Sequence, residues 1–423
     1  MQTKFTTAQL ANPRTAGSHA EIRKCVHCGF CTATCPTYVL LADERDGPRG
    51  RIELIKAMLE DGGAPSRETV THVDRCLSCM ACKTACPSSV DYARLIEHGR
   101  AHIEATYRRP WPQRLLRAAI PAVLTRPGRL KAALALGRLA QPLGPLLDRL
   151  RLKPLAALLR LVPASAGAGS AAGTYAAQGI VRGRVALLQG CVEPQMAPQI
   201  RAAAIRLITR AGYEVVLADG EGCCGALSEH LGRAEEARGL AAANVQAWRR
   251  AGPFDAIVTT AAGCGTTLKD YGHRLPGDPA AAQAAELARD VLEFIGSVGL
   301  PAVTQASGLS VAYHAACSLQ HGQGVKGAPE RLLAAAGFAV SPVREGHLCC
   351  GSAGVYNILQ PTLATQLRDR KAANIALTGA AVVAAGNVGC IAQLAPALST
   401  PIVHPVELLD WATGGPIPAG LQP

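Results

Sequence analysis

The chain has 423 residues, of which 49% are hydrophobic and 17% charged, a composition that excludes a mostly disordered protein. This length exceeds what one hydrophobic core usually serves, so we expect two or three domains. The net charge is +12, but aromatic residues make up only 4%, which argues against the base-stacking surfaces of single-stranded nucleic-acid binders.

The N-terminal residues 1–21 lack the apolar core of a secretory signal, so we expect a cytoplasmic protein. The chain contains 16 cysteines, and they cluster at short spacings instead of being spread as in a small secreted domain. This clustering is typical of metal ligands and argues against a disulfide framework.

Residues 1–107 contain two runs of four cysteines, each with the pattern C-x-x-C-x-x-C-x-x-x-C-P. Three closely spaced thiolates can hold three corners of an iron-sulfur cubane, and a fourth cysteine before a proline closes the site. A tetrahedral zinc site needs two separated cysteine pairs, so two [4Fe-4S] clusters are the better interpretation. In two-cluster proteins the fourth cysteine of each run serves the other cluster. The predicted ligands are therefore Cys25, Cys28, Cys31 and Cys86 for cluster 1, and Cys76, Cys79, Cys82 and Cys35 for cluster 2.

The sequence around these runs predicts a helical ferredoxin domain. Residues 51–60 place apolar side chains along one helix face, and the two runs lie 51 residues apart, more than compact β-type ferredoxins allow. Residues 46–51, Asp-Gly-Pro-Arg-Gly-Arg, are either a solvated turn or an arginine-bearing loop that supports the cluster sulfurs. His27, between two predicted ligands, either tunes cluster 1 or is an ordinary polar neighbour.

Residues 108–183 form a basic segment followed by a linker. Between residues 108 and 160, twelve Arg or Lys stand against one acid, Asp148. Leu-rich cationic stretches such as residues 146–153 fit an anionic membrane surface, an acidic partner or an ordinary solvated connector. No recognised motif supports nucleic-acid binding. We expect the prolines to shorten every helix here, and the low-complexity stretch 163–170 to be a linker.

Residues 184–300 and 301–423 repeat one pattern of four cysteines at a constant offset of 126, which indicates a duplicated module. Each module contains a Cys-Cys-Gly sequence. Adjacent cysteines make poor structural disulfides, and the glycine lets the backbone approach a bulky group, so we predict a further metal or redox site. The alternative is that these are small buried residues with free thiols. The thiols concerned are Cys191, Cys223, Cys224 and Cys264 in the first module, and Cys317, Cys349, Cys350 and Cys390 in the second.

Short apolar runs precede the first and last cysteines of each module, at residues 185–188, 255–260, 311–314 and 381–385. Helix-length stretches separate them, which predicts parallel strands with crossover helices, and cysteines just past the carboxyl ends of strands. Residues 372–406 are uncharged, but their glycines and proline indicate a strand, a turn and a helix, so we predict no transmembrane helix. The predicted fold class is α+β and multidomain: a helical two-[4Fe-4S] ferredoxin domain followed by a duplicated α/β Cys-Cys-Gly module with parallel strands.

Two such runs combined with two Cys-Cys-Gly modules resemble the family of iron-sulfur subunits found in glycolate oxidase, anaerobic glycerol-3-phosphate dehydrogenase, lactate-utilisation proteins and heterodisulfide reductase. The resemblance spans almost the whole chain, and residues 25–38, 46–52, 318–321 and 347–354 look most like the subunits of bacterial glycolate oxidases. In the heterodisulfide reductase relatives each module ends C-x-x-C and can hold an unusual cluster. Here that final cysteine is replaced by Thr267 and Gln393, which leaves an additional iron-sulfur cluster in the modules open.

The resemblance implies an electron-transfer subunit of an oxidoreductase complex, without catalytic residues of its own. Partner subunits that bind FAD would oxidise glycolate to glyoxylate, and this chain would carry the electrons singly towards a quinone-type acceptor at the cytoplasmic face of the inner membrane. The chain has no G-x-G-x-x-G fingerprint after a strand, so we predict no flavin in it. The alternatives are the iron-sulfur subunit of a lactate or glycerol-3-phosphate dehydrogenase, a catalytic subunit resembling heterodisulfide reductase, and a scaffold with vestigial module thiols.

Overall fold

The structure is a computed structural model that describes the chain except residues 151, 153–154, 157–158, 160–161, 163–169 and 423. The predicted linker 163–170 therefore lies outside the described residues, apart from Ser170, and so do two residues of the stretch 146–153. Within the described ranges, no helix is both long and apolar enough to cross a membrane.

The N-terminal part is a helical domain. Its helices are α1 (Thr7–Leu10), α2 (Pro13–Lys24), α3 (Pro36–Leu41), α4 (Pro48–Asp61), α5 (Arg67–Asp74), α6 (Ala81–Thr84) and α7 (Tyr92–Thr106), with a 3-10 turn η1 (Glu44–Asp46). The helix predicted over residues 51–60 is confirmed as part of α4, which Pro48 begins and the left-handed Gly62 ends. Ile55 on α4 and Leu95 and Ile103 on α7 are fully buried in the core of this domain.

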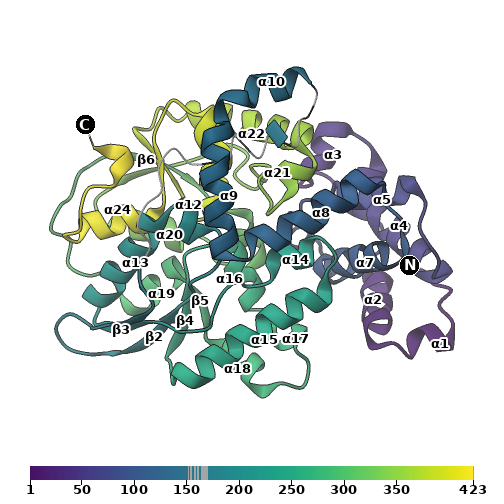
Figure 1. Ribbon diagram of the computed structural model, residues 1–423, viewed down its shortest axis with the longest axis horizontal. Coiled ribbons are helices and arrows are strands. Elements are labelled where there is room, and N and C mark those ends of the chain that lie inside the picture. The colour runs from purple at the N-terminus through teal and green to yellow at the C-terminus, as the bar shows by residue number, and fades with distance from the viewer. Residues whose placement is uncertain (151, 153–154, 157–158, 160–161, 163–169, 423) are drawn as a thin grey trace.

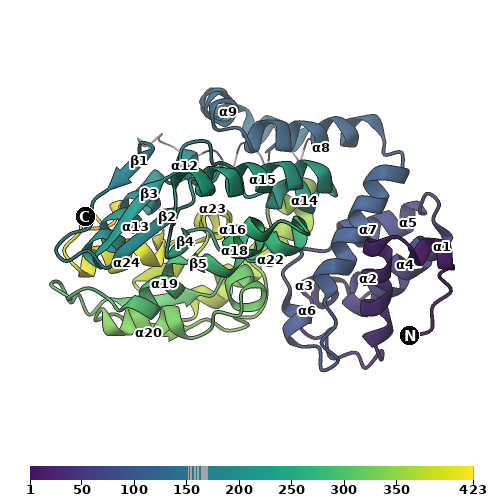
Figure 2. The ribbon, with the colours of Figure 1, turned by 90° about the horizontal axis from the view of Figure 1, so that it is seen from below.

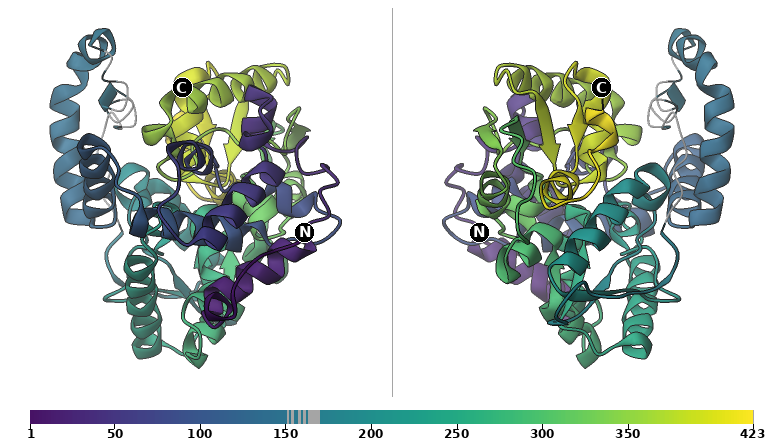
Figure 3. Two further views of the ribbon diagram at one scale, coloured as in Figure 1. Left: turned by 90° about the vertical axis from the view of Figure 1, so that its right-hand side faces the viewer. Right: turned by 90° about the vertical axis from the view of Figure 1, so that its left-hand side faces the viewer.

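The basic segment folds into an arm along one side of the molecule (Figures 2 and 3). It consists of α8 (Trp111–Leu124), α9 (Pro127–Ala140), the turn η2 (Gln141–Leu143) and α10 (Gly144–Arg149). The expectation that prolines shorten every helix is wrong for α8 and α9, which have 14 residues each. Pro112 and Pro127 lie in the first turns, where the missing N–H is not needed, although Pro121 lies inside α8.

The first module has a sheet of five strands in the order β1-β3-β2-β4-β5. The strands are β1 (Gly173–Tyr175), β2 (Gly183–Leu187), β3 (Tyr213–Leu217), β4 (Ala256–Thr259) and β5 (Ala288–Asp290). The helices are α12 (Glu193–Met196), α13 (Pro198–Arg210), α14 (Ala226–His230), α15 (Ala234–Ala251), α16 (Ala262–Leu268), α17 (Tyr271–Arg274), α18 (Pro279–Leu287) and α19 (Val291–Val298). Four strands are parallel as predicted, but β1 at the edge is antiparallel to β3 and comes from the segment expected as a linker.

The second module has a parallel sheet in the order β7-β6-β8-β9. Its strands are β6 (Ser310–His314), β7 (Ala339–Pro342), β8 (Val382–Ala385) and β9 (Ile402–Val403). The other elements are the π-helical turn η3 (Ser318–Gly322), α20 (Ala328–Ala335), α21 (Tyr356–Leu359), α22 (Pro361–Ala376), α23 (Val388–Leu394), the turn η4 (Ala395–Ala397), α24 (Pro405–Ala412) and the turn η5 (Ala419–Leu421). The order β3-β2-β4-β5 of the first module is repeated here, which confirms the duplication.

The two modules share one hydrophobic core, because buried side chains from both sheets belong to the same cluster. Helix α13 of the first module packs against α24 of the second. The fully buried carboxylate of Asp410 on α24 accepts hydrogen bonds from Arg206 and Arg210 on α13, which ties the modules together.

The helical domain packs against both modules (Figure 1). Arg94 on α7 forms an ion pair with Asp270 of the first module, at 2.8 Å between Nη1 and Oδ2. Thr84 on α6 hydrogen-bonds His321 of the second module, at 2.8 Å from Oγ1 to Nδ1. The loops that carry the second cysteine run therefore face the module pair.

Candidate metal centres

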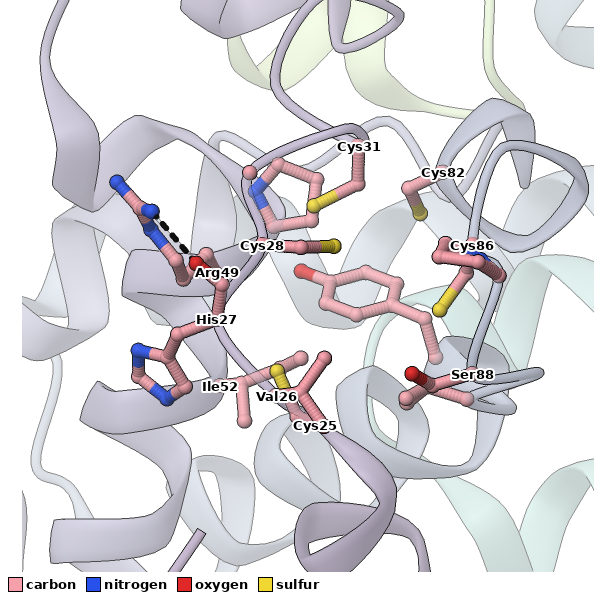
Figure 4. A pocket seen from close by; sticks show the side chains of 15 residues that line it. Cys25, Val26, His27, Cys28, Cys31, Arg49, Ile52, Cys82, Cys86 and Ser88 are labelled. Atoms are coloured by element: carbon pink, nitrogen blue, oxygen red, sulfur yellow. Dashed lines mark hydrogen bonds between the residues drawn. The ribbon is translucent and has the colours of Figure 1, made fainter.

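The cysteines predicted to bind cluster 1 line one pocket at the edge of the helical domain, which we call the outer pocket. Cys25, Cys28 and Cys31 come from the loop between α2 and α3, and Cys86 from the loop after α6. Figure 4 shows the sulfurs of Cys28, Cys31, Cys82 and Cys86 turned towards a common centre. Cys28 is exposed, so the outer pocket reaches the molecular surface.

The cysteines predicted to bind cluster 2 line a second pocket, which we call the inner pocket. Cys35 lies at the start of α3, whereas Cys76, Cys79 and Cys82 come from the loop after α5 and the first turn of α6. All four are buried. The structure thus brings the fourth cysteine of each run to the loop of the other run.

Both cysteine loops have the same unusual backbone conformation. His27 and Gly29 in the first loop have positive φ angles of 57° and 83°, and Ser78 and Met80, 51 residues later, have 53° and 62°. A left-handed conformation at non-glycine residues is costly, so the fold must enforce it for a reason. In the second loop the Ser78 N–H donates to Cys76 Sγ at 3.4 Å.

The donor set of each pocket fits an iron-sulfur cluster. Burial, together with the neighbouring thiols, raises the pKa of Cys31 in the outer pocket to about 11. The same causes raise the pKa values of Cys79 and Cys82 in the inner pocket well above that of an ordinary thiol. Thiols crowded in this way become thiolates when cations neutralise them, which iron does in a cluster.

The sequence allows two interpretations of residues 46–51, either a solvated turn or an arginine-bearing loop that supports the cluster sulfurs. The structure favours the second interpretation, because Asp46 and Arg51 are completely buried. Arg51 donates to Asp46 Oδ1 at 3.3 Å, to Thr37 Oγ1 at 2.9 Å and to Cys35 Sγ at 3.8 Å. Burial opposes its charge, but Cys76, Tyr92, Cys35 and Asp46 outweigh burial and raise the Arg51 pKa. A permanent cation therefore lies beside a sulfur of the inner pocket.

His27 is better described as an ordinary polar neighbour than as a tuning residue. Its imidazole lies 3.5 Å from Glu53 Oε1, and Figure 4 shows the ring directed away from the pocket sulfurs. Its carbonyl oxygen accepts a hydrogen bond from Arg49 Nη1 at 3.0 Å. The residue therefore helps to hold the loop through its backbone.

All eight module cysteines line one cavity of about 160 Å³ between the two modules, which we call the module cavity. Cys191 and Cys264 follow β2 and β4, and Cys317 and Cys390 follow β6 and β8, so these positions past the strand ends are confirmed. The two sets meet in this cavity, which the sequence did not indicate. The repeat predicted two sites, and the structure places them in a single cavity.

Sulfur atoms in the module cavity lie close together. The Sγ atoms of Cys224 and Cys264 are 3.3 Å apart, and those of Cys317 and Cys349 are 3.8 Å apart. The hydrogen bond to Cys349 and burial raise the pKa of Cys317 well above that of an ordinary thiol. Such a dense set of thiols is suited to binding metal or to thiol redox chemistry.

The three sites lie in series. Cys82 and Tyr92 line both the outer and the inner pocket, and Leu77 and Ser78 line both the inner pocket and the module cavity. Cys79 of the inner pocket also packs in one cluster with Cys349 of the second module. The outer pocket, the inner pocket and the module cavity therefore lie next to one another in that order.

Several residues of these sites had no signal in the sequence analysis. Arg100 on α7 donates to the carbonyl of Cys76 and to Ser78 Oγ, and so fixes the second cysteine loop. Glu193, in the module cavity, is buried and accepts a hydrogen bond of 2.6 Å from Thr260, and burial raises its pKa. Arg100 lies well after the second cysteine run, Glu193 lies two residues after Cys191, and no spacing rule identifies either.

Gly351, which follows Cys349-Cys350, has a φ of 88°, and a Cβ atom there would lie 2.5 Å from the carbonyl oxygen of Ala364. Gly351→Ala is therefore expected to destabilise the second module by roughly 2 kcal/mol or more, from backbone strain plus overlap with α22. The measurement is the shift in Tm of the anaerobically purified chain. Gly324→Ala is the matched control, because its φ is 73° and nothing lies within 4 Å. Equal shifts for the two variants would show that the close approach to α22 is unimportant.

Two family models match the chain. A model described as a 4Fe-4S dicluster domain matches residues 21–90, and a model described as a cysteine-rich domain matches residues 185–269 and 311–395. All 16 cysteines lie within these ranges. The family models therefore cover the outer pocket, the inner pocket and the module cavity.

The chain is also similar to curated proteins along its length. It is 38% identical to the glycolate oxidase iron-sulfur subunit of Escherichia coli (strain K12), over 97% of this chain and 99% of that protein. It is 30% identical to the probable glycolate oxidase iron-sulfur subunit of Bacillus subtilis (strain 168), over 88% of each. The lactate utilization protein A of Exiguobacterium is 28% identical over 54% of this chain and 95% of that protein.

Proposed function

Since the chain belongs to the family of glycolate oxidase iron-sulfur subunits, we propose that it carries electrons from FAD-containing partner subunits towards a quinone-type acceptor. The partners oxidise glycolate to glyoxylate in this proposal, and the iron-sulfur subunit receives the electrons one at a time. Flavin chemistry moves electrons in pairs, and a cluster accepts one, so such a complex needs a subunit that separates them.

The observation that supports this proposal most directly is the series of the outer pocket, the inner pocket and the module cavity. Adjacent sites that share lining residues are suited to relaying electrons across a protein. The exposed Cys28 lies at one end of the series, and the exposed Val26 and Phe30 flank it. We assign this surface to the docking of the flavoprotein, so that electrons enter at the outer pocket.

We assign the ligands as the pockets group them: Cys25, Cys28, Cys31 and Cys86 for one [4Fe-4S] cluster, and Cys35, Cys76, Cys79 and Cys82 for the other. The clusters, when bound, supply reversible one-electron chemistry. The surrounding residues hold the thiolates in place and exclude water. Arg51 donates to Cys35 Sγ, and the Tyr92 hydroxyl donates to Cys76 Sγ at 3.8 Å.

The experiment is to purify the chain anaerobically with its partner subunits and to add glycolate, lactate or glycerol-3-phosphate separately. We expect glycolate to bleach the visible absorbance of the clusters and to produce the EPR signals of reduced clusters. The isolated chain should not respond, because in this proposal the partner subunits oxidise the substrate. Reduction by lactate or glycerol-3-phosphate instead of glycolate would assign the chain to a different dehydrogenase. A reduced flavin with oxidised clusters would contradict electron transfer itself.

A catalytic role in disulfide reduction is the second candidate, and the eight thiols of the module cavity favour it. However, both modules lack the final cysteine found in heterodisulfide reductase relatives. Turnover of a small heterodisulfide by the isolated, chemically reduced chain would support this role. The electron-transfer proposal predicts that no turnover occurs.

We further propose that the basic arm contacts an anionic membrane, where a quinone would be found. Five exposed leucines recur every three or four residues along the arm. They are Leu136 and Leu139 on α9, Leu143 at the end of η2, Leu146 on α10 and Leu150 directly after α10. Arg129, seven residues before Leu136, lies on the same face and is also exposed. An apolar stripe combined with basic side chains is typical of helices that lie in the membrane interface.

Replacing Arg129 and Lys131 of the arm by glutamine should weaken binding to anionic vesicles by about 30-fold, because each basic residue near the surface contributes about 1 kcal/mol. The measurement is flotation with vesicles containing phosphatidylserine, at low and at physiological salt. The Leu136→Gln/Leu139→Gln variant tests the apolar stripe independently of charge. Neutral vesicles are the control, and wild-type binding that is equal on both vesicle types would contradict the electrostatic contact.

A further inference from the structure

Three buried residues of the second module bring together a nitrogen and two sulfur atoms. One ligand atom from each of His314, Cys350 and Cys390 lies within 4.8 Å of the other two. The exposed fractions of these side chains are 1%, 1% and 3%. They come from three separate elements: the end of β6, the loop after β7, and α23. Two of these residues, Cys350 and Cys390, also line the module cavity, and His314 does not.

The imidazole of His314 has no hydrogen-bond partner at either nitrogen among the residues that the structure describes. A buried polar group without a partner costs about 1–3 kcal/mol. His72 and His230 each have one such nitrogen, but His314 has both. His404, by contrast, uses Nε2 with the Thr260 carbonyl at 2.9 Å and Nδ1 with the Val406 N–H at 3.1 Å. The unsatisfied nitrogens of His314 therefore point to a bound group that supplies the missing interaction.

The first module does not offer the same donor set. Its residue 126 positions before His314 is Leu188, although Cys224 and Cys264 correspond to Cys350 and Cys390. Leu188 is buried at the same strand end, which shows that an apolar side chain fits there. The histidine is thus a specific feature of the second module and not a requirement of the repeated fold.

We propose that His314, Cys350 and Cys390 together bind one thiophilic divalent metal ion, zinc or ferrous iron, in the second module. The site goes beyond the electron-transfer function and does not rest on it. Imidazole and thiolate are the ligands that both ions favour in proteins. Three protein ligands leave the fourth position of a tetrahedral ion free, and Cys350 and Cys390 also line the module cavity. A water molecule or a thiol in that cavity completes the coordination.

The spacing of the donors favours one ion over a cubane. Donor atoms on one tetrahedral ion lie about 3–4 Å apart, because metal–sulfur bonds are about 2.3 Å and metal–nitrogen bonds about 2.0–2.1 Å. A cubane distributes its thiolates over four irons, which holds the sulfurs farther apart. Asn387 Nδ2 donates to Cys390 Sγ at 3.5 Å, the kind of outer hydrogen bond that orients a metal-bound thiolate.

The test compares metal and sulfide contents of the full-length chain, purified anaerobically and reconstituted with its two clusters, after addition of Zn²⁺ or Fe²⁺. Wild type is expected to retain one ion beyond the irons of the two clusters, without additional acid-labile sulfide. His314→Leu, which introduces the residue of the first module, is expected to lose that ion. Cys264→Ser is the matched control for Cys390→Ser, and it should retain the ion while Cys390→Ser loses it.

Cobalt(II) added in place of the ion gives a second readout, because tetrahedral thiolate coordination produces intense visible bands that His314→Leu should abolish. Unchanged EPR signals of the two clusters in this variant would show that it is folded. Retention of the ion by His314→Leu, or a wild type that binds no ion, would overturn the proposal. Four additional irons with matching sulfide would also overturn it in favour of a third cluster. Loss of electron transfer with the ion still bound would instead contradict only the proposed function.

Discussion

Cys86→Ala is expected to remove the cluster of the outer pocket and to leave that of the inner pocket in place. Cys86 belongs to the second cysteine run by sequence, but it lines the pocket formed by the first run. The iron content of the reconstituted chain should therefore fall from eight per chain to about four, since the dicluster domain accounts for two [4Fe-4S] clusters. EPR spectra of the reduced chain would show which of the two signals is lost.

Cys35→Ala is the reciprocal variant. It should remove the cluster of the inner pocket, because Cys35 belongs to the first cysteine run but lines this pocket. If each substitution removed the cluster of its own run instead, the crossed assignment of ligands would be wrong. In the assembled complex, both variants should lose quinone reduction. Reduction of an artificial dye by the flavoprotein should persist, because the dye takes electrons before the clusters do.

Arg51→Met is expected to lower the free energy of unfolding by about 3 kcal/mol, the lower end of the cost of removing one partner of a buried ion pair, because Asp46 keeps its contacts with Arg75 and His72. Asp46 is fully buried and also contacts Arg75, at 2.8 Å, and His72, at 3.0 Å. Removing Arg51 takes away a cation that Asp46 and Cys35 both contact. The measurement is thermal or denaturant unfolding of the cluster-loaded chain under anaerobic conditions.

The same substitution should lower the reduction potential of the inner cluster. Reduction adds negative charge, and the cation beside Cys35 Sγ stabilises the reduced form more than the oxidised form. A redox titration followed by EPR measures this shift separately from stability. Arg51→Lys keeps the positive charge but loses the planar guanidinium group with its several N–H donors. Compared with Arg51→Met, it should restore much of the reduction potential of the inner cluster and less of the free energy of unfolding.

Arg45→Ala is the control for both effects, because this arginine pairs with Asp43 and Glu68 at the protein surface, close in sequence to Arg51. We expect little change in stability or potential from it, since exposed ion pairs are screened by solvent. An unchanged potential of the inner cluster in Arg51→Met would contradict an electrostatic role for Arg51 and leave it a structural one.

The grouping of thiols in the helical domain was accessible from the sequence because it depends on short spacings. Within each run the first three cysteines are separated by two residues, so one tight loop must bring them together whatever the rest of the chain does. The duplicated modules were accessible for a related reason: a constant offset of 126 aligns both the cysteines and the apolar runs, which form β2, β4, β6 and β8. Strand β1 was missed because its three residues give no periodic signal.

The sequence by itself determined which cysteines are the candidates for the chemistry and in which local loops they lie. Only the tertiary structure decided how the sites combine: that both modules open into one cavity, that Arg51 lies against Cys35, and that His314 joins Cys350 and Cys390. The physical reason is how far apart along the sequence the contacting residues lie. Local spacing is fixed by the covalent chain, whereas a contact such as that of Thr84 with His321 joins residues 237 positions apart. Contacts of that kind arise when helices and sheets bury their apolar faces against one another, and no local pattern in the sequence specifies them.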